Sequence, residues 1–182
     1  MDKEDRREQL IALGLKAFAS QPYDALSIDA LAQAAGISKG LLYHYFPTKR
    51  DYYVATVREA ARVLRRETMA PDSVPPLERL DRGLHAYLAF AERHGAAYLA
   101  LMRGGGGADR DISRVLDETR EELLGRVLSD APAAHGELRL RLRGWIAFVE
   151  TTAIEWLEHH KPDRDALVAL WKRLFFALVP PE

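Results

Sequence analysis

The chain of 182 residues contains no cysteine, so disulfide bonds, thiol nucleophiles and cysteine-based zinc sites are excluded. Its six histidines show no spacing typical of a metal site. The sequence has no nucleophile elbow, and no spacing argues that two carboxylates lie close together. These absences predict a protein that is not an enzyme and that holds neither a metal nor a cofactor.

Long apolar runs are missing as well. No stretch approaches the roughly 20 residues that a membrane-spanning helix needs. The segment from Met1 to Arg6 has mixed charge, where a secretory signal would carry an apolar stretch. An apolar fraction of 48% with 29% charged residues is typical of a folded globular chain rather than a disordered one. We therefore expect a cytosolic protein with no membrane partner.

Strand periodicity is nearly absent, and apolar residues recur at helical spacing along almost the whole chain. We expect an all-α fold of about nine helices, among them a helix from Lys49 to about Thr68 and a final pair over 137–160 and 163–179. One stretch, Leu138 to Arg143, alternates as a strand would. We still predict a helix there, because helical spacing continues beyond it and no partner strand exists.

Acidic residues are missing from one short segment. The net charge of −1 gives no indication of nucleic acid, and residues 1–51 hold seven Lys/Arg against seven acids. From Gly36 to Arg50, however, Lys39, Lys49 and Arg50 occur without any acid. Such a local positive patch is of the kind that attracts phosphates.

Residues 27–46 predict two short helices joined by a tight turn at Gly36, which is the layout of a helix-turn-helix. Ser27 is a good N-cap for the first helix and Ser38 for the second. A helix-turn-helix of this kind is an indication of DNA binding and not proof of it. In the alternative interpretation, the aromatic run from Tyr43 to Phe46 is only a corner of the core.

The second of these helices has two distinct faces. At about 100° per residue, Leu42 and Phe46 point into the core. Gly40 and His44 lie almost opposite, where a glycine lets the backbone approach a major groove. Tyr43 and His44 can both donate hydrogen bonds to phosphates. The pattern suits a helix whose N-terminus enters the major groove of DNA.

The next helix begins with a capping box, in which Thr48 is followed three residues later by Asp51. Lys49 and Arg50 then lie at the positive end of the helix dipole, at a cost of a few tenths of a kcal/mol. A DNA phosphate bound at this helix N-terminus would offset that cost.

The run from Ile37 to Arg50, preceded by Ser27–Ala32 and Ala35-Gly36, closely resembles the N-terminal domain of the TetR family of regulators, over about residues 7–54. The resemblance implies base-edge contacts from Ser38, Lys39, Gly40 and Leu41. It implies phosphate contacts from Tyr43, His44 and Lys49, with Ser27 near the DNA backbone. Two positions depart from the family pattern. Leu41 is apolar and would contact a thymine methyl, and Gln21-Pro22-Tyr23 stands where many members have glycine before the aromatic residue.

Beyond residue 70 the chain is similar to the family in architecture only. The resemblance implies a homodimer in which the last two helices of each copy form a four-helix bundle. The apolar positions expected at that interface are Leu138, Leu142, Ile146, Val149, Leu167, Leu170, Leu174 and Leu178. A core helix of a monomer is the alternative, although a single helix-turn-helix binds DNA weakly.

A small-molecule effector, hydrophobic or aromatic, is the second expected partner. The candidate contacts are aromatic or flexible residues, namely Tyr87, Phe90, Tyr98, Met102, Trp145, Phe148 and Trp156. Such residues are also ordinary core residues, and that alternative stays open. The run from Gly104 to Gly107 lacks the pattern of a phosphate loop. It is a connector or a hinge at the mouth of the pocket. Arg139, Arg141 and Arg143 fit solvated side chains better than contacts to an acidic effector.

Taken together, these patterns predict a helix-turn-helix DNA-binding domain over 1–48, a connecting helix over 49–70 and an effector-binding and dimerisation domain over 71–182. The function expected is sequence-specific transcriptional regulation. Repression from a palindromic double-stranded DNA operator, released by the effector, is favoured. A ligand-dependent activator and a protein-interaction module with a vestigial helix-turn-helix are the alternatives.

Overall fold

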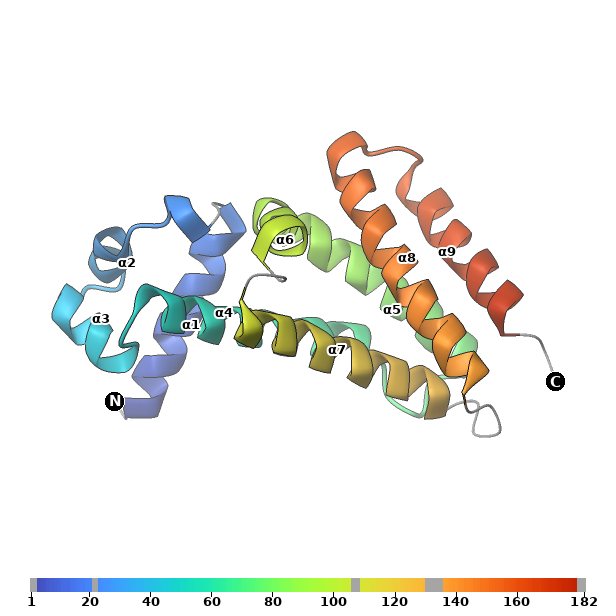
Figure 1. Ribbon diagram of the computed structural model, residues 1–182, viewed down its shortest axis with the longest axis horizontal. Coiled ribbons are helices and arrows are strands. Elements are labelled where there is room, and N and C mark those ends of the chain that lie inside the picture. Colours follow the sequence, from blue (N-terminus) through green and yellow to red (C-terminus); the bar gives the residue numbers. More distant parts are fainter. Residues whose placement is uncertain (1–2, 21–22, 106–108, 130–135, 180–182) are drawn as a thin grey trace. The chain divides into compact units, whose positions relative to one another are not determined.

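The fold is known from a computed structural model that describes residues 3–20, 23–105, 109–129 and 136–179 (Figure 1). All regular elements of these residues are helical, so the predicted all-α fold is confirmed. The α-helices are α1 (Lys3–Ser20), α2 (Ile28–Ala34), α3 (Lys39–Tyr45), α4 (Lys49–Thr68), α5 (Pro76–Arg93), α6 (Gly95–Ala100), α7 (Arg110–Ser129), α8 (Glu137–His159) and α9 (Arg164–Leu178). Two short helices complete the set, η1 (Tyr23–Ala25) and η2 (Leu101–Gly105).

The chain forms two compact units, neither of which is continuous in sequence. The first comprises Met1–Val63 and Arg93–Val115, and the second Leu64–Glu92 and Leu116–Glu182. Helices α4 and α7 contribute residues to both units. The expected functional division at 48 and 70 is not tested by this grouping and stays a prediction.

The first unit has its core where α1, α2, α3 and the start of α4 meet. Leu42 and Phe46 are 1% and 3% exposed, which confirms that they point inward. Tyr52 is buried beside them, and its hydroxyl donates a 2.6 Å hydrogen bond to the carbonyl oxygen of Leu10. Burial raises the pKa of this phenol. The hydrogen bond ties α4 to α1 and so supports the two helices that follow α1.

Gly14 of α1 lies against Tyr52 and Thr56 of α4. A Cβ atom at this position would lie 2.6 Å from Thr56 Oγ1 and 2.8 Å from the Tyr52 hydroxyl oxygen. Both distances are too short for a carbon atom, so the packing of α1 on α4 requires glycine here.

The second unit is built around α8 and α9, which pack against each other. Trp145 Nε1 donates to the carbonyl oxygen of Trp171 at 2.9 Å, and Trp171 Nε1 donates to Thr152 Oγ1 at 2.7 Å. These bonds satisfy indole N–H groups that burial removes from water. The helix predicted over Leu138–Arg143 is confirmed, since α8 begins at Glu137. Among the described helices, none combines the length and apolar content that crossing a membrane requires.

Candidate nucleic-acid interface

The helix-turn-helix consists of α2, α3 and a turn at Gly36. Gly36 has φ 65, a left-handed conformation that glycine adopts without steric cost. Ser27 Oγ accepts the Ala30 N–H at 3.3 Å, and Ser38 Oγ accepts the Leu41 N–H at 3.1 Å. Both predicted N-caps are therefore confirmed as local structure. They fix where each helix starts and leave the first turn of α3 facing outward.

The exposed face of α3 holds most of the residues expected to meet DNA. Ser38, Lys39, Gly40 and His44 are exposed, and Leu41 is 40% exposed although it is apolar. Tyr43 is half-buried against the core of the unit. Apart from its chain neighbours and the backbone of its own helix, a Cβ at Gly40 would have only Ser38 Oγ within 4 Å, at 3.9 Å, so this side of the helix is open. The arrangement can present backbone and short side chains to the edges of bases.

Lys39, the first residue of α3, is paired within the protein. Its Nζ donates to Asp29 Oδ2 at 2.9 Å, which links the first turns of α3 and α2. This hydrogen bond to Asp29, together with the charge of the carboxylate, raises the pKa of Lys39. Asp29 is a favourable acid in the first turn of α2, but its pairing with Lys39 was not predicted, because the two lie ten positions apart on either side of a turn.

The start of α4 has the predicted capping box. The Asp51 N–H donates to Thr48 Oγ1 at 3.0 Å, and the Thr48 N–H donates to Asp51 Oδ2 at 3.1 Å. Lys49 lies at this helix start with its Nζ 4.5 Å from the centroid of the Tyr23 ring, a cation–π arrangement. The Tyr23 ring in turn lies 4.7 Å from that of Tyr53.

The structure corrects the interpretation of Arg50. The sequence pattern suggested that a DNA phosphate offsets the cost of this cation, yet its guanidinium already has two carboxylate partners in the same unit. Arg50 donates to Asp109 at 2.6 and 2.8 Å and to Asp111 Oδ2 at 2.7 Å. These hydrogen bonds raise the pKa of Arg50 and hold those of Asp109 and Asp111 below their usual range. The partners lie 59 and 61 residues away, so the sequence carried no signal for them.

The residues expected to contact an effector are divided between the units. Tyr98 and Met102 belong to the first unit, whereas Tyr87, Phe90, Trp145, Phe148 and Trp156 belong to the second. All except Met102 and Phe148 are buried. The indole N–H groups of Trp145 and Trp156 donate hydrogen bonds to backbone carbonyl oxygens of their own unit. The structure thus uses several of these aromatics as core, and contact with an effector stays a prediction.

A surface groove of about 280 Å³ lies in the first unit, between α1 and the end of α2. Its lining residues are Arg6, Gln9, Leu10, Ala12, Leu13, Lys16, Ala34 and Ala35. None of the residues expected to bind an effector lines it.

The residues expected at a dimer interface differ in exposure. Leu138, Leu142, Val149 and Leu167 are buried in the core of their own unit, and Ile146, Leu170, Leu174 and Leu178 are half-buried. A side chain that is buried within its own unit has little accessible surface left to bury against a second copy. The stripe of α8 that remains exposed carries Leu140, Gly144, Ala147 and Thr151, and α9 exposes Phe176 and Ala177.

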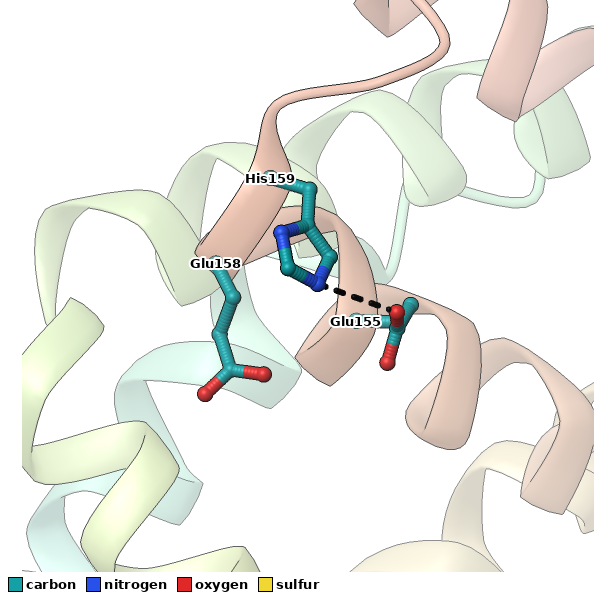
Figure 2. Close-up of side chains that lie close together, drawn as sticks. All are labelled: Glu155, Glu158 and His159. Carbon is teal, nitrogen blue, oxygen red and sulfur yellow. Dashed lines mark ion pairs between the residues drawn. The ribbon is translucent and has the colours of Figure 1, made fainter.

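At the end of α8, Glu155, Glu158 and His159 bring their possible ligand atoms within 4.8 Å of one another (Figure 2). His159 Nε2 lies 3.2 Å from Glu155 Oε1. All three side chains are exposed, and groups of this kind are common on helix surfaces without an ion. The cluster alone therefore does not make a metal site.

Two further sequence features are placed by the structure. Arg139 and Arg143 both form ion pairs with Glu121, and Arg141 forms one with Glu137. These exposed arginines are therefore held by carboxylates of the protein itself. Gly104 and Gly105 end η2. Gly106 and Gly107, like Gln21 and Pro22, lie outside the described residues.

A capped α2, a glycine turn and a capped α3 with an exposed first turn are the arrangement of helix-turn-helix proteins that bind DNA. Residues 10–56 match the family described as "Bacterial regulatory proteins, tetR family". Residues 76–178 match "Tetracyclin repressor-like, C-terminal domain". The chain belongs to the TetR family of DNA-binding transcriptional regulators.

Individual relatives agree with this assignment. A crystal structure of a tetR-family transcriptional regulator from Streptomyces coelicolor is 34% identical, with a TM-score of 0.86 over 98% of this chain and 80% of that one. The "HTH-type transcriptional activator FasR" of Mycolicibacterium smegmatis is 23% identical over 92% of this chain and 80% of its own length. The regulator FadR from Bacillus subtilis, solved in complex with stearoyl-CoA, shares the fold with a TM-score of 0.68 at 16% identity, over 95% and 97% of the two chains.

Proposed function

We propose that this regulator is a repressor that binds a palindromic operator as a homodimer and leaves it when a small hydrophobic or aromatic molecule binds. The observation that carries the proposal is the first turn of α3, where Lys39, Gly40 and Leu41 are exposed on a helix capped by Ser38. In this geometry Lys39 and Gly40 suit hydrogen bonds to base edges, and Leu41 suits a thymine methyl. Ser27, Tyr43, His44 and Lys49 are proposed to contact the sugar-phosphate backbone.

The dimer is supported by the exposed stripe of α8. Leu140, which is 72% exposed, lies on the same face of α8 as the exposed small residues Gly144 and Ala147. Small residues let two helices approach closely, and burial of this stripe by the same stripe of a second copy gives a two-fold interface. Two helix-turn-helix units then read half-sites about 34 Å apart.

The effector proposal rests on composition rather than on a defined pocket. Tyr87, Phe90 and Trp145 give the second unit a strongly aromatic interior. The FadR structure with stearoyl-CoA shows that this fold accommodates a long acyl ligand in one relative. Release of the operator when the effector binds is the mechanism favoured in the sequence analysis. Because the relative FasR is named an activator, activation by ligand is the second candidate.

The test is fluorescence anisotropy of the purified protein on DNA flanking its own coding region, at two salt concentrations, followed by selection from random duplexes. We expect saturable binding that survives competitor DNA and weakens steeply with salt. Binding of selected duplexes no tighter than of random ones contradicts the proposal and favours an interaction module with a vestigial helix-turn-helix.

Effector binding is tested separately by thermal shift against a panel of acyl and aromatic compounds. A hit that raises the melting temperature is then added to the protein–operator complex. Release of DNA is expected for a repressor, whereas tighter binding identifies a ligand-dependent activator. A compound that is chemically converted by the protein contradicts the expectation that it has no catalytic activity.

A further inference from the structure

The three cations of the segment from Gly36 to Arg50 all have partners inside the protein. Lys39 is paired with Asp29, Arg50 with Asp109 and Asp111, and Lys49 lies over the ring of Tyr23. The sequence shows a positive patch without acids, but folding brings three carboxylates to it. The patch is therefore far less positive than the sequence suggests.

Lys39 and Asp29 form a pair at the surface of the helix-turn-helix. Their side chains are 50% and 70% exposed, so the pair is accessible to a competing anion. Lys39 is also the first residue of α3, where the helix dipole disfavours a cation. The contact at 2.9 Å holds the ammonium at the Asp29 carboxylate, so a phosphate or a base edge has to compete for it.

Arg50 is held more firmly than Lys39. Three hydrogen bonds use its Nε and Nη2 atoms, two of them in the parallel arrangement that guanidinium and carboxylate groups favour. Asp109 Oδ1 also accepts the backbone N–H groups of Asp111 and Ile112, at 2.9 and 3.3 Å. These bonds cap the start of α7 and fix the position of the carboxylate. Nearly half of the Arg50 side chain is nevertheless exposed to solvent.

We propose that Asp29, Asp109 and Asp111 limit the affinity for DNA of any sequence by holding Lys39 and Arg50 in intramolecular ion pairs. This inference rests on the proposed function, because Lys39 is a proposed DNA contact and Arg50 directly follows another, Lys49, at the start of α4. The carboxylates compete with DNA phosphates for the two cations. On DNA without the operator sequence, the cations stay with their carboxylates.

The physical basis is the size of the phosphate contribution. Contacts between cations and phosphates supply nearly all of non-specific binding, and each contact adds about one unit to the slope of log affinity against log salt. A genome offers a large excess of non-operator sites, so a regulator with every cation free is held away from its operator. Internal carboxylates lower this contribution, and of the residues proposed to read bases only Lys39 is paired in this way.

The experiment measures binding of random-sequence duplexes of about 30 base pairs to the full chain and to Asp29→Asn and the double variant Asp109→Asn/Asp111→Asn. Asparagine keeps the size of aspartate and, at position 109, the ability to cap the start of α7. We expect each variant to bind about two- to fivefold more tightly at low salt, the range of a surface ion pair. The gain should shrink at high salt, because the slope steepens by about one for each cation released.

A matched control is Asp165→Asn, which makes the same chemical change at an exposed position in the first turn of α9, in the second unit. It alters the net charge by one unit, as Asp29→Asn does. We expect its affinity for random duplexes to equal that of the unmodified protein. Circular dichroism melting of each variant verifies that the fold is retained.

Unchanged or weaker binding by the Asp29 and Asp109/Asp111 variants overturns the proposal. Weaker binding would mean that the carboxylates position the cations for DNA rather than withhold them. An equal gain in the Asp165→Asn control also overturns it, because net charge alone would then explain the effect. Absence of duplex binding by every protein, even at low salt, instead contradicts the proposed function and the inference with it.

Discussion

Gly14 shows how a single residue limits the packing of the DNA-binding unit. A methyl group there would meet Thr56 Oγ1 and the hydroxyl of Tyr52, which is itself bonded to Leu10. We expect Gly14→Ala to lower the free energy of unfolding by about 1–3 kcal/mol through overpacking. Urea unfolding followed by far-UV circular dichroism measures this change.

Gly125→Ala in α7 is the matched control, since a Cβ there has no neighbour within 4 Å. It should be neutral or stabilise the protein by up to about 1 kcal/mol through helix propensity. Equal destabilisation by both substitutions would show that the close contact at Gly14 is relieved without cost.

Leu41 is the residue through which this chain departs most clearly from polar base readout. Its side chain is 40% exposed, so Leu41→Ala should leave stability within about 0.5 kcal/mol of the original. We expect the variant to lose about 1 kcal/mol of affinity for the selected operator, on the scale of one mismatched base pair. Repeating the selection should show weaker preference for thymine at one position in each half-site. An unchanged selected sequence argues against a contact between Leu41 and a base.

At the scale of elements, the first turn of α4 combines a capping box with a cation expected to meet phosphate. Lys49→Ala should weaken binding to operator and random duplexes alike and reduce the salt slope by about one, because one phosphate contact is lost. Titrations at several salt concentrations provide both quantities. Lys16→Ala, which removes the same charge from an exposed position of α1, serves as control and should leave both unchanged. A sequence-dependent loss would mean that Lys49 reads bases.

The contact of Arg50 with the start of α7 predicts a dependence of stability on pH. The pKa of Asp109 and of Asp111 is lowered by hydrogen bonding to Arg50, so the folded state favours the ionised carboxylates. Their contribution is complete above the ordinary carboxyl pKa of about 4 and is lost as pH falls through the lower folded values. Urea midpoints from pH 6 to pH 3 should fall more steeply for the unmodified protein than for Asp109→Asn/Asp111→Asn. Parallel curves would show that the pairs do not stabilise the unit.

The same elements show what could be predicted from the sequence. The caps at Ser27 and Ser38 and the Thr48–Asp51 box were predictable because their partners lie three residues apart and helix geometry fixes the contact. The inward direction of Leu42 followed from periodicity. The Arg50–Asp109 contact was not predictable, since it depends on how distant helices pack. On α8, apolar residues face more than one side, so spacing could not separate the core from an interface.

For the whole molecule, the exposed stripe of α8 carries the proposed dimer. Ala147→Glu places a charge in the middle of that stripe and should convert dimer to monomer, because a buried unpaired charge is costly. Sedimentation equilibrium measures the change, and operator affinity should fall as the second half-site contact is lost. Ala96→Glu on an exposed position of α6 is the control and should remain dimeric. A dimeric Ala147→Glu variant would place the interface elsewhere.

The distribution of aromatic residues gives the protein a built-in spectroscopic reporter. All three tryptophans, Trp145, Trp156 and Trp171, belong to the second unit and are buried there, whereas six of the seven tyrosines belong to the first. Selective excitation of tryptophan therefore monitors the second unit alone, whereas far-UV circular dichroism monitors the helices of both units. Melting curves that coincide by the two signals would mean that the units unfold as one cooperative system. If the two melting curves differ, the part of the circular dichroism transition that tryptophan fluorescence does not follow reports the melting of the first unit, without any label or truncation.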